Sequence, residues 1–315
     1  MMHESLGIPA CFSSSERQND DPATVIRSGQ SAFMSIYRTK LAGQCRLITI
    51  TWCKDLLLHG LSVTVQATNG RDDHHCKVEL KPWNFWRKQG SKQFVIDDRI
   101  VDVVWDFKAA KFNGETEPQS DYYLAIICEE EVALLLGDLK KNAYRRTRCR
   151  PSLIEPILVS RKEHVFGKKR FTTRIKSHEK GQFVEISIEC KKDGDNGEVD
   201  PQLEIKADGQ LAIQVKHLQW KFRGNDAINL SKTRVEVCWD VHDWLFGSGP
   251  RHGLFIIKPV SQSPLTKSAP SSPTSSLSST SMPFLSQEVN SASVADDIAG
   301  GPSSFCLFLY AWKMN

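Results

Sequence analysis

Two carboxylates and an imidazole lie within four positions toward the end of the chain, at Asp240, His242 and Asp243. Such groups together can bind a metal ion or move protons near neutral pH. A related stretch earlier in the chain has an acid at Asp106 and no histidine after it. An acid that follows a strand also caps a helical turn by accepting a backbone N–H. Because both stretches keep the acid and only one has the histidine, we expect Asp106 and Asp240 each to cap a short helical stretch. This is favoured over a hydrolytic or metal enzyme site.

A second group with metal-binding residue types is His74-His75-Cys76. Adjacent residues of a strand point to opposite faces, so these three side chains do not converge on one ion. The sequence also contains no CxxC pair, no P-loop, and neither a GxSxG nor an HExxH motif. We expect neither a metal nor a cofactor, and we assign no catalytic residue.

The strongest charge feature is a basic segment from Lys140 to Arg174. It contains twelve Lys or Arg and two acids, although the whole chain has a formal net charge of only +4. Clustered charges of one sign add their fields locally, so the segment predicts association with nucleic acid or another polyanion, or a nuclear-import signal. A solvated helix face and loop would have the same composition. The residues assigned to polyanion binding are Lys140, Lys141, Arg145, Arg146, Lys168, Lys169 and Arg170.

These candidates need elements to position them, and the pattern predicts strands. Short runs rich in Val, Ile, Thr and aromatic residues recur from residue 33 onward, separated by Gly, Asp and Asn. Such alternation is typical of antiparallel strands. The strands predicted in the first half are 46–52, 61–66, 76–81, 93–96, 100–105, 122–128 and 132–136. Residues 137–146 predict a short basic helix, with Asp138 as its cap and Pro151 beyond its end.

The strand pattern occurs twice. Residues 101–106 read VDVVWD, and residues 235–240 read VEVCWD, 134 positions later. Three further pairs match in the same order: 51–54 with 188–191, 78–81 with 213–216, and 124–127 with 254–257. We infer an internal duplication of an all-β unit. The predicted fold is two antiparallel units, barrels or sandwiches of about eight strands each, around a pseudo-twofold axis and joined by the basic helix.

Two further segments combine aromatic residues with cations, at 83–88 and 218–223. Surfaces that bind single-stranded nucleic acid have this composition. In the second segment Leu218, Trp220 and Phe222 alternate with polar residues, which is typical of a strand with one buried face. The alternation favours core packing.

The chain divides into four parts. Residues 1–30 predict a disordered tail, 31–137 the first β unit, 138–170 the basic helix and connector, and 171–315 the second unit. Within the second unit, residues 261–303 are a Ser/Pro-rich insertion that we expect to be disordered, and Ser263 and Ser272 each precede a proline. Neither a signal peptide nor an apolar run of spanning length occurs, which predicts an intracellular protein of the cytoplasm or nucleus.

Several longer motifs point to a family. They are TITWCK at 49–54, LLLGDLKK at 134–141, SRKEHVFGKKRF at 160–171, the segments 214–225 and 239–246, and the run at 305–313. With these motifs, the chain from about residue 30 onward resembles the plant family called domain of unknown function 868. The resemblance implies a plant source, and it implies no activity, cofactor or catalytic residue.

From the residues we expect a non-catalytic binding protein whose β units hold a small apolar ligand or a protein partner. The alternative is polyanion or nucleic-acid association through residues 140–174. An enzyme that uses Asp240, His242 and Asp243 is the third hypothesis.

Overall fold

The computed structural model is built mainly from β-strands. It describes residues 31–55, 58–66, 74–80, 88–176, 183–193, 200–230, 233–247, 251–260 and 305–313. Within these ranges the chain forms strands β1 to β18 and two short helices, α1 and α2. Neither helix of the described part has the length and apolarity needed to span a bilayer.

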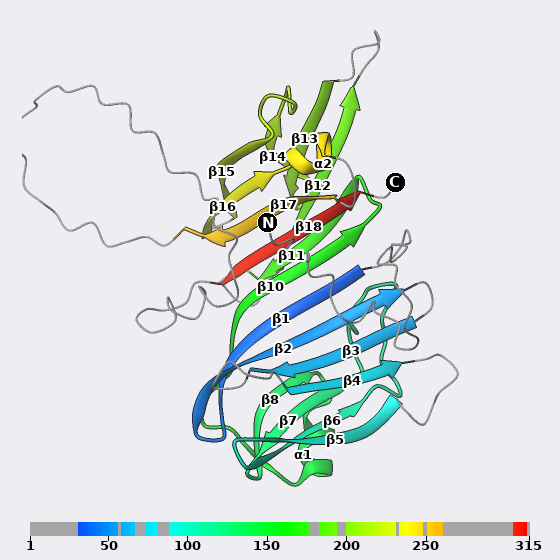
Figure 1. The fold of residues 1–315 in the computed structure, drawn as a ribbon, viewed down its shortest axis with the longest axis vertical. Coiled ribbons are helices and arrows are strands. Elements are labelled where there is room, and N and C mark those ends of the chain that lie inside the picture. The colour runs from blue at the N-terminus through cyan, green and yellow to red at the C-terminus, as the bar shows by residue number, and fades with distance from the viewer. Residues whose placement is uncertain are drawn as a thin grey trace, which may run out of the picture.

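One large sheet extends through the whole molecule (Figure 1), in the order β15-β16-β17-β18-β10-β1-β2-β3-β4. Its strands are β1 (Ser31–Leu41), β2 (Gln44–Asp55), β3 (Leu58–Val65), β4 (His74–Leu80), β10 (Ile157–Phe166), β15 (Arg223–Leu230), β16 (Thr233–Asp240), β17 (Arg251–Pro259) and β18 (Cys306–Lys313). Neighbouring strands pair antiparallel except β10 and β18, which pair in parallel. Strand β10 therefore joins the two halves of the chain into one continuous sheet.

Two smaller sheets pack on the large one. The first has the order β5-β6-β7-β8-β9, with β5 at Gln89–Ile96, β6 at Arg99–Asp106, β7 at Tyr123–Cys128, β8 at Glu131–Gly137 and β9 at Arg150–Pro151. The second has the order β11-β12-β13-β14, with β11 at Arg170–Lys176, β12 at Phe183–Asp193, β13 at Asp200–Ala207 and β14 at Gln210–Val215.

Alternating apolar residues form the core of each half, since every second side chain of a strand points to the same face. In the first half, Ile48, Ile50 and Trp52 of β2 share a core with side chains of β6 and β7. In the second half, Ile186 and Ile188 of β12 share a core with side chains of β16, β17 and β18. Each half is thus two sheets packed face to face.

Both small sheets cover the same face of the large sheet. Trp52 of the first core lies opposite Phe33 of β1, and Phe33 lies opposite Glu163 of β10. Residues directly opposite each other on paired strands point to one face. Val165, two positions after Glu163, belongs to the second core. The paired strands β1 and β10, which we call the seam, therefore lie between the two small sheets.

Helix α1 (Lys140–Thr147) covers the outer face of β7 and β8, where Ala143 is fully buried. The predicted helix is confirmed, but the predicted cap is wrong. The Asp138 carboxylate accepts the backbone N–H groups of Asp121 and Tyr122, at 3.0 and 3.1 Å, and gives α1 no side-chain cap. The reason is the turn at Gly137, whose φ of +95° brings the chain so close to Tyr122 that a Cβ would collide with its carbonyl.

The predicted strands of the first half are confirmed, and the barrel alternative is wrong. All three sheets are open in the part of the chain that the structure describes. The alternation predicts a strand over 218–223, but residues 218–222 form turns and a bend, and the side chain of Trp220 is 80% exposed. The connector 138–170 contains the ten-residue strand β10. The predicted tail 1–30, the aromatic residues 83–87 and the insertion 261–303, with Ser263 and Ser272, lie outside the described residues.

Candidate functional site

The two acids and the histidine of the second half lie in a turn between β16 and α2 (His242–Phe246). Asp240 accepts the backbone N–H of His242 at 3.2 Å and the side chain of Arg223 at 2.8 Å. His242 contacts Asp243 at 2.9 Å, and the Asp243 side chain is 72% exposed. The Asp240 carboxylate thus contacts the backbone and Arg223, and the imidazole pairs with the other acid. The predicted helix cap is therefore wrong at Asp240: the N-cap of α2 is Val241, α2 has no side-chain cap, and the Asp240 carboxylate fixes the turn before the helix instead.

Asp106 makes matching contacts in the first half. Its carboxylate accepts the backbone N–H of Lys108 at 3.1 Å and the side-chain amide of Gln89 at 2.8 Å. The short helical stretch predicted after Asp106 is wrong, because residues 107–110 form a bend. Both acids therefore fix the chain where it leaves a strand, and only Asp240 leads into a helix.

Metal-binding side chains do not gather in the described ranges: no three His, Cys, Asp or Glu residues lie close enough together to hold an ion. The backbone of His74-His75-Cys76 lies on β4, and the side chains of those three residues lie outside the description. Burial raises the pKa of Cys306 to about 11 and also raises the pKa values of Cys128 and Cys238. These thiols stay protonated near neutral pH, and a buried protonated thiol packs as a small apolar group.

The basic residues assigned to polyanion binding fall into two places. Lys140, Lys141, Arg145 and Arg146 are exposed on α1, at the lower end of the molecule in Figure 1. Lys168, Lys169 and Arg170 are exposed where β10 turns into β11. The ten residues of β10 separate the two groups, which corresponds to roughly 30 Å of strand. The structure therefore brings four of the seven cations together and holds the other three apart.

A cavity of about 220 Å³ opens between the end of α1 and the outer face of the five-stranded sheet. Arg146, Thr147 and Cys149 line it from one side, and Ser91, Asp102, Val104 and Ile127 line it from the other. This volume is below the roughly 300 Å³ at which small-molecule sites begin, and the lining mixes charged and polar groups with two aliphatic side chains. It offers little support for a small apolar ligand.

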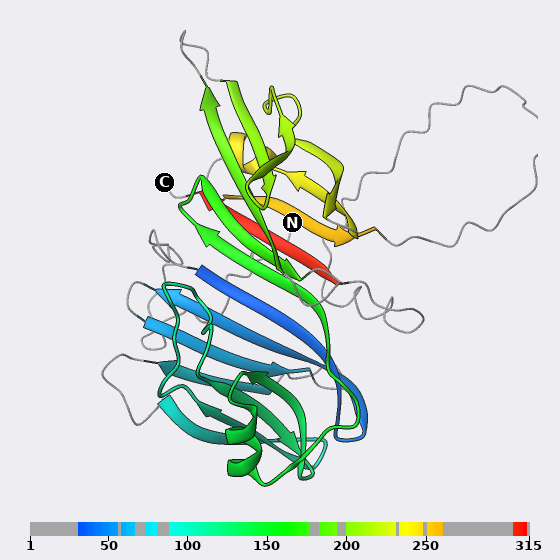
Figure 2. The same ribbon diagram turned by 180° about the vertical axis from the view of Figure 1, so that it is seen from behind.

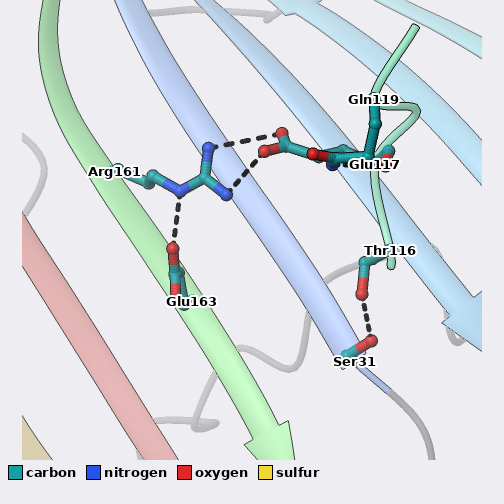
Figure 3. Close-up of polar contacts among 6 residues, drawn as sticks. All are labelled: Ser31, Thr116, Glu117, Gln119, Arg161 and Glu163. Carbon is teal, nitrogen blue, oxygen red and sulfur yellow. Dashed lines mark hydrogen bonds and ion pairs between the residues drawn. The ribbon is translucent and has the colours of Figure 1, made fainter. Parts of the chain in front are cut away.

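A partly buried ionic cluster lies on the seam and was not predicted (Figure 3). The Nε of Arg161 donates to Glu163 at 2.6 Å, and its two terminal nitrogens donate to the two carboxylate oxygens of Glu117 at 2.8 and 3.3 Å. The ring of Phe33 lies 5.0 Å from the guanidinium. Glu117 belongs to the connection between β6 and β7, so Arg161 fastens that connection to the seam.

The electrostatics of this cluster follow from burial. Glu163 is 2% exposed, and burial raises its pKa even though Arg161 acts in the opposite direction. Burial also acts to lower the pKa of Arg161, but the carboxylates of Glu117 and Glu163 outweigh it and raise the pKa. Each of the three guanidinium nitrogens thus donates one hydrogen bond to an acid. The geometry is that of a structural clamp rather than of an acid–base pair.

A layer of aromatic and imidazole rings occupies the opposite face of the large sheet. His164 stacks on Tyr310 with 4.7 Å between ring centroids, and its Nδ1 accepts the indole N–H of Trp312 at 3.1 Å. Burial lowers the pKa of His164 to about 3, with smaller contributions from His252 and Lys162. The imidazole is neutral near pH 7, as an acceptor of that hydrogen bond must be.

The sequence contains signals for the clustered residues. Arg161 and Glu163 are two positions apart in β10, so their side chains share a face, a pattern that marks charges on the same side of a strand. Leu153 and Ile154 lie between two prolines, immediately after the basic helix, and they are among the exposed apolar residues. The two prolines with Leu153 and Ile154 between them therefore indicate a short apolar turn that follows the basic helix.

The chain was also compared with known proteins. Residues 28–313 match the model of a family described as plant protein of unknown function (DUF868). Neither the curated proteins nor the solved structures contain a match. Since the family model covers most of the chain, the protein belongs to the plant proteins of unknown function called DUF868.

Proposed function

We propose that the protein is a non-catalytic binding protein that engages a polyanionic partner through the exposed cations of α1. The observation that supports this most is the composition of the helix. Four of its eight residues, Lys140, Lys141, Arg145 and Arg146, are basic and exposed, and none is acidic. A one-sign cluster of this kind creates a local potential that attracts anions.

Helix stability does not account for all four cations. Arg145 and Arg146 occupy the last turn, where the helix dipole favours positive charge. Lys140 and Lys141 occupy the first turn, where the same dipole disfavours it by about 0.3–1 kcal/mol each. Because Lys140 and Lys141 lower the stability of the helix, their presence supports a role in binding.

The other ligand expected from the sequence, a small apolar molecule inside a β unit, has less support. The interiors of both halves are filled by the core side chains described above, and the cavity next to α1 is small and partly charged. A protein partner with an acidic surface remains within the proposal, and so does an intracellular location in the cytoplasm or nucleus.

Retention on heparin and binding to duplex DNA, measured over a range of salt concentrations, test the proposal. If the four cations of α1 engage the phosphate backbone, log K falls with log salt at a slope of about −3 to −4. Sequence preference is slight, since phosphate contacts do not read bases. Failure to bind either polyanion at low ionic strength, where surface charge is least screened, would contradict the proposal.

We also infer that the two halves derive from an internal duplication. The strand order supports this: β1 to β4 followed by β5 to β8 in the first half resembles β11 to β14 followed by β15 to β18 in the second. Gly90 lies opposite Trp105, and Gly224 lies opposite Trp239, with each indole ring over the glycine. In both halves the acid after the tryptophan accepts a backbone N–H two residues on. An experimental structure whose two halves fail to superpose strand by strand would contradict the inference.

A further inference from the structure

Three aliphatic side chains project into solvent just after the basic helix. Leu153, Ile154 and Ile157, which we call the apolar knuckle, are 98%, 48% and 47% exposed. One exposed aliphatic residue is ordinary in a soluble protein. Three within five positions form a local apolar surface, which is typical of a site that meets another surface.

The local chain geometry accounts for this exposure. The knuckle follows the two-residue strand β9, at the edge of the five-stranded sheet, and ends with Ile157, the first residue of β10. The hydroxyl of Ser152 accepts the backbone N–H of Ile154 at 3.2 Å, which forms a tight turn with Leu153 at its tip. Pro151 and Pro156 restrict the backbone on either side. The turn therefore holds Leu153 outward in a defined conformation.

The knuckle and the basic helix lie at the same end of the molecule. Figures 1 and 2 both show the connection leaving α1 at the lower end and running up one side of the molecule to β10. Residues 140–157 include six Lys or Arg and one acid, Glu155. Arg150 pairs with Glu131 at 3.2 Å, and Arg148, at the end of α1, is exposed. The exposed aliphatic side chains of the knuckle therefore lie next to a positively charged surface.

We propose that this end of the molecule docks on an anionic lipid bilayer, with the cations of α1 at the headgroups and the apolar knuckle inserted among the acyl chains. The inference rests on the proposed function, because it names the polyanion that the α1 cations meet. An anionic membrane surface attracts each nearby Lys or Arg, and buried aliphatic side chains add to that attraction. The phosphate backbone of duplex DNA can pair with the cations, but it offers no apolar surface for Leu153 or Ile154.

Sedimentation with lipid vesicles tests the inference on the full chain. The vesicles contain phosphatidylcholine with phosphatidylserine as one third of the lipid, and vesicles of phosphatidylcholine alone are the control. We expect binding to the anionic vesicles only. The double variant Leu153→Ser/Ile154→Ser should bind them at least about tenfold more weakly while keeping its retention on heparin, since it removes buried aliphatic area and no charge. Both side chains are exposed, so the fold should tolerate the change.

Trp220→Ser is the matched control, because Trp220 is a large exposed side chain in a turn of the other half. It should leave vesicle binding unchanged. The inference is overturned if the double variant binds anionic vesicles as the wild type does, if Trp220→Ser weakens binding equally, or if the wild type binds heparin but no vesicle. In these cases the proposed function still holds if the wild type binds heparin. A wild type that does not bind heparin overturns both the proposed function and the membrane inference.

Discussion

Arg161 of β10 and Glu117 of the β6–β7 connection form a two-point ion pair across 44 positions of sequence. The pair lies on the seam, where the two halves of the chain share one sheet, and Glu163 accepts the remaining Nε–H of the same guanidinium. A connection that belongs to the first half is thereby fastened to the strand that leads into the second half.

This clamp predicts a large loss of stability when Arg161 is removed. Arg161→Met leaves the carboxyl of Glu163, 2% exposed, without its charged partner, and breaking a buried pair in this way costs about 3–5 kcal/mol. Replacing Glu163 by Met as well should restore much of the loss. Urea unfolding measures both effects.

The control for this prediction is Arg99→Met. Arg99 pairs with Glu129, and both side chains are about half exposed. An exposed pair contributes about 0–1 kcal/mol. If Arg161→Met costs no more than Arg99→Met, the clamp does not stabilise the seam.

The matching acids of the two halves should act alike. Asp106→Ala and Asp240→Ala should each cost roughly 0.5–2 kcal/mol in the free energy of unfolding, because each removes the acceptor of a backbone N–H. Asparagine at either position should recover part of the loss, since its amide oxygen accepts the same bond. His242→Ala should change the thermal midpoint little. An assayed activity that His242→Ala abolishes at unchanged stability would instead identify a reactive site.

Stability should fall on acidification because of His164. Its pKa is about 3 in the folded state, below the ordinary value of about 6.5, so the unfolded chain binds the extra proton between these values. Stability is therefore complete above about pH 6.5 and decreases as the pH falls toward 3. His164→Gln keeps an acceptor for Trp312 and cannot titrate. Between pH 7 and 5 the wild type should lose about 2 kcal/mol more than this variant in urea unfolding. Equal losses would contradict the role given to His164.

The Ser/Pro-rich insertion should be dispensable for folding. Strands β17 and β18 pair antiparallel, with Ile257 opposite Leu307, so their facing ends can be joined by a short turn. Deleting residues 261–303 and connecting Val260 to Phe305 through a short Gly-containing turn should leave the thermal midpoint within a few degrees. The entropic cost of closing a loop changes by only about 0.6 kcal/mol per doubling of length. A Gly/Ser linker of the original length is the control, and a large drop in the midpoint of both variants would show that the native segment stabilises the body.

The sequence predicted strands well and their partners poorly. Alternating apolar residues identified β2, β6 and β7 because the two-residue period of a strand is visible locally. Strand β10 was assigned to a connector, since its run from Ser160 to Phe166 mixes Arg161, Glu163 and His164 with apolar residues. Those polar side chains are stabilised by contacts with Glu117 and Trp312, which are far away in the sequence. The residue pattern within one segment cannot reveal contacts with distant residues, so it could not predict β10.

The segment 218–223 shows the opposite error, since a strand was predicted where the chain turns. Leu218, Trp220 and Phe222 alternate as strand residues do, but only Leu218 is fully buried. The backbone N–H of Leu218 bonds to the carbonyl of Pro201, and those of Trp220 and Lys221 bond to the carbonyl of His217, which forms turns. His217 has a φ of +55°, a left-handed conformation that a strand excludes. The basic helix, in contrast, was predicted in type and place, because its four cations and its buried Ala143 fit one period.

In the proposed function, α1 and not the second basic group meets the polyanion. This contact is tested most directly by the salt dependence of duplex DNA binding, measured by fluorescence anisotropy for two variants. The first replaces Lys140, Lys141, Arg145 and Arg146 by Gln, and the second replaces Lys168, Lys169 and Arg170 by Gln. We expect the slope of log K against log salt to become shallower by about 3–4 in the first variant and to change by less than about 1 in the second. A first variant that keeps the wild-type affinity and slope would contradict binding through α1.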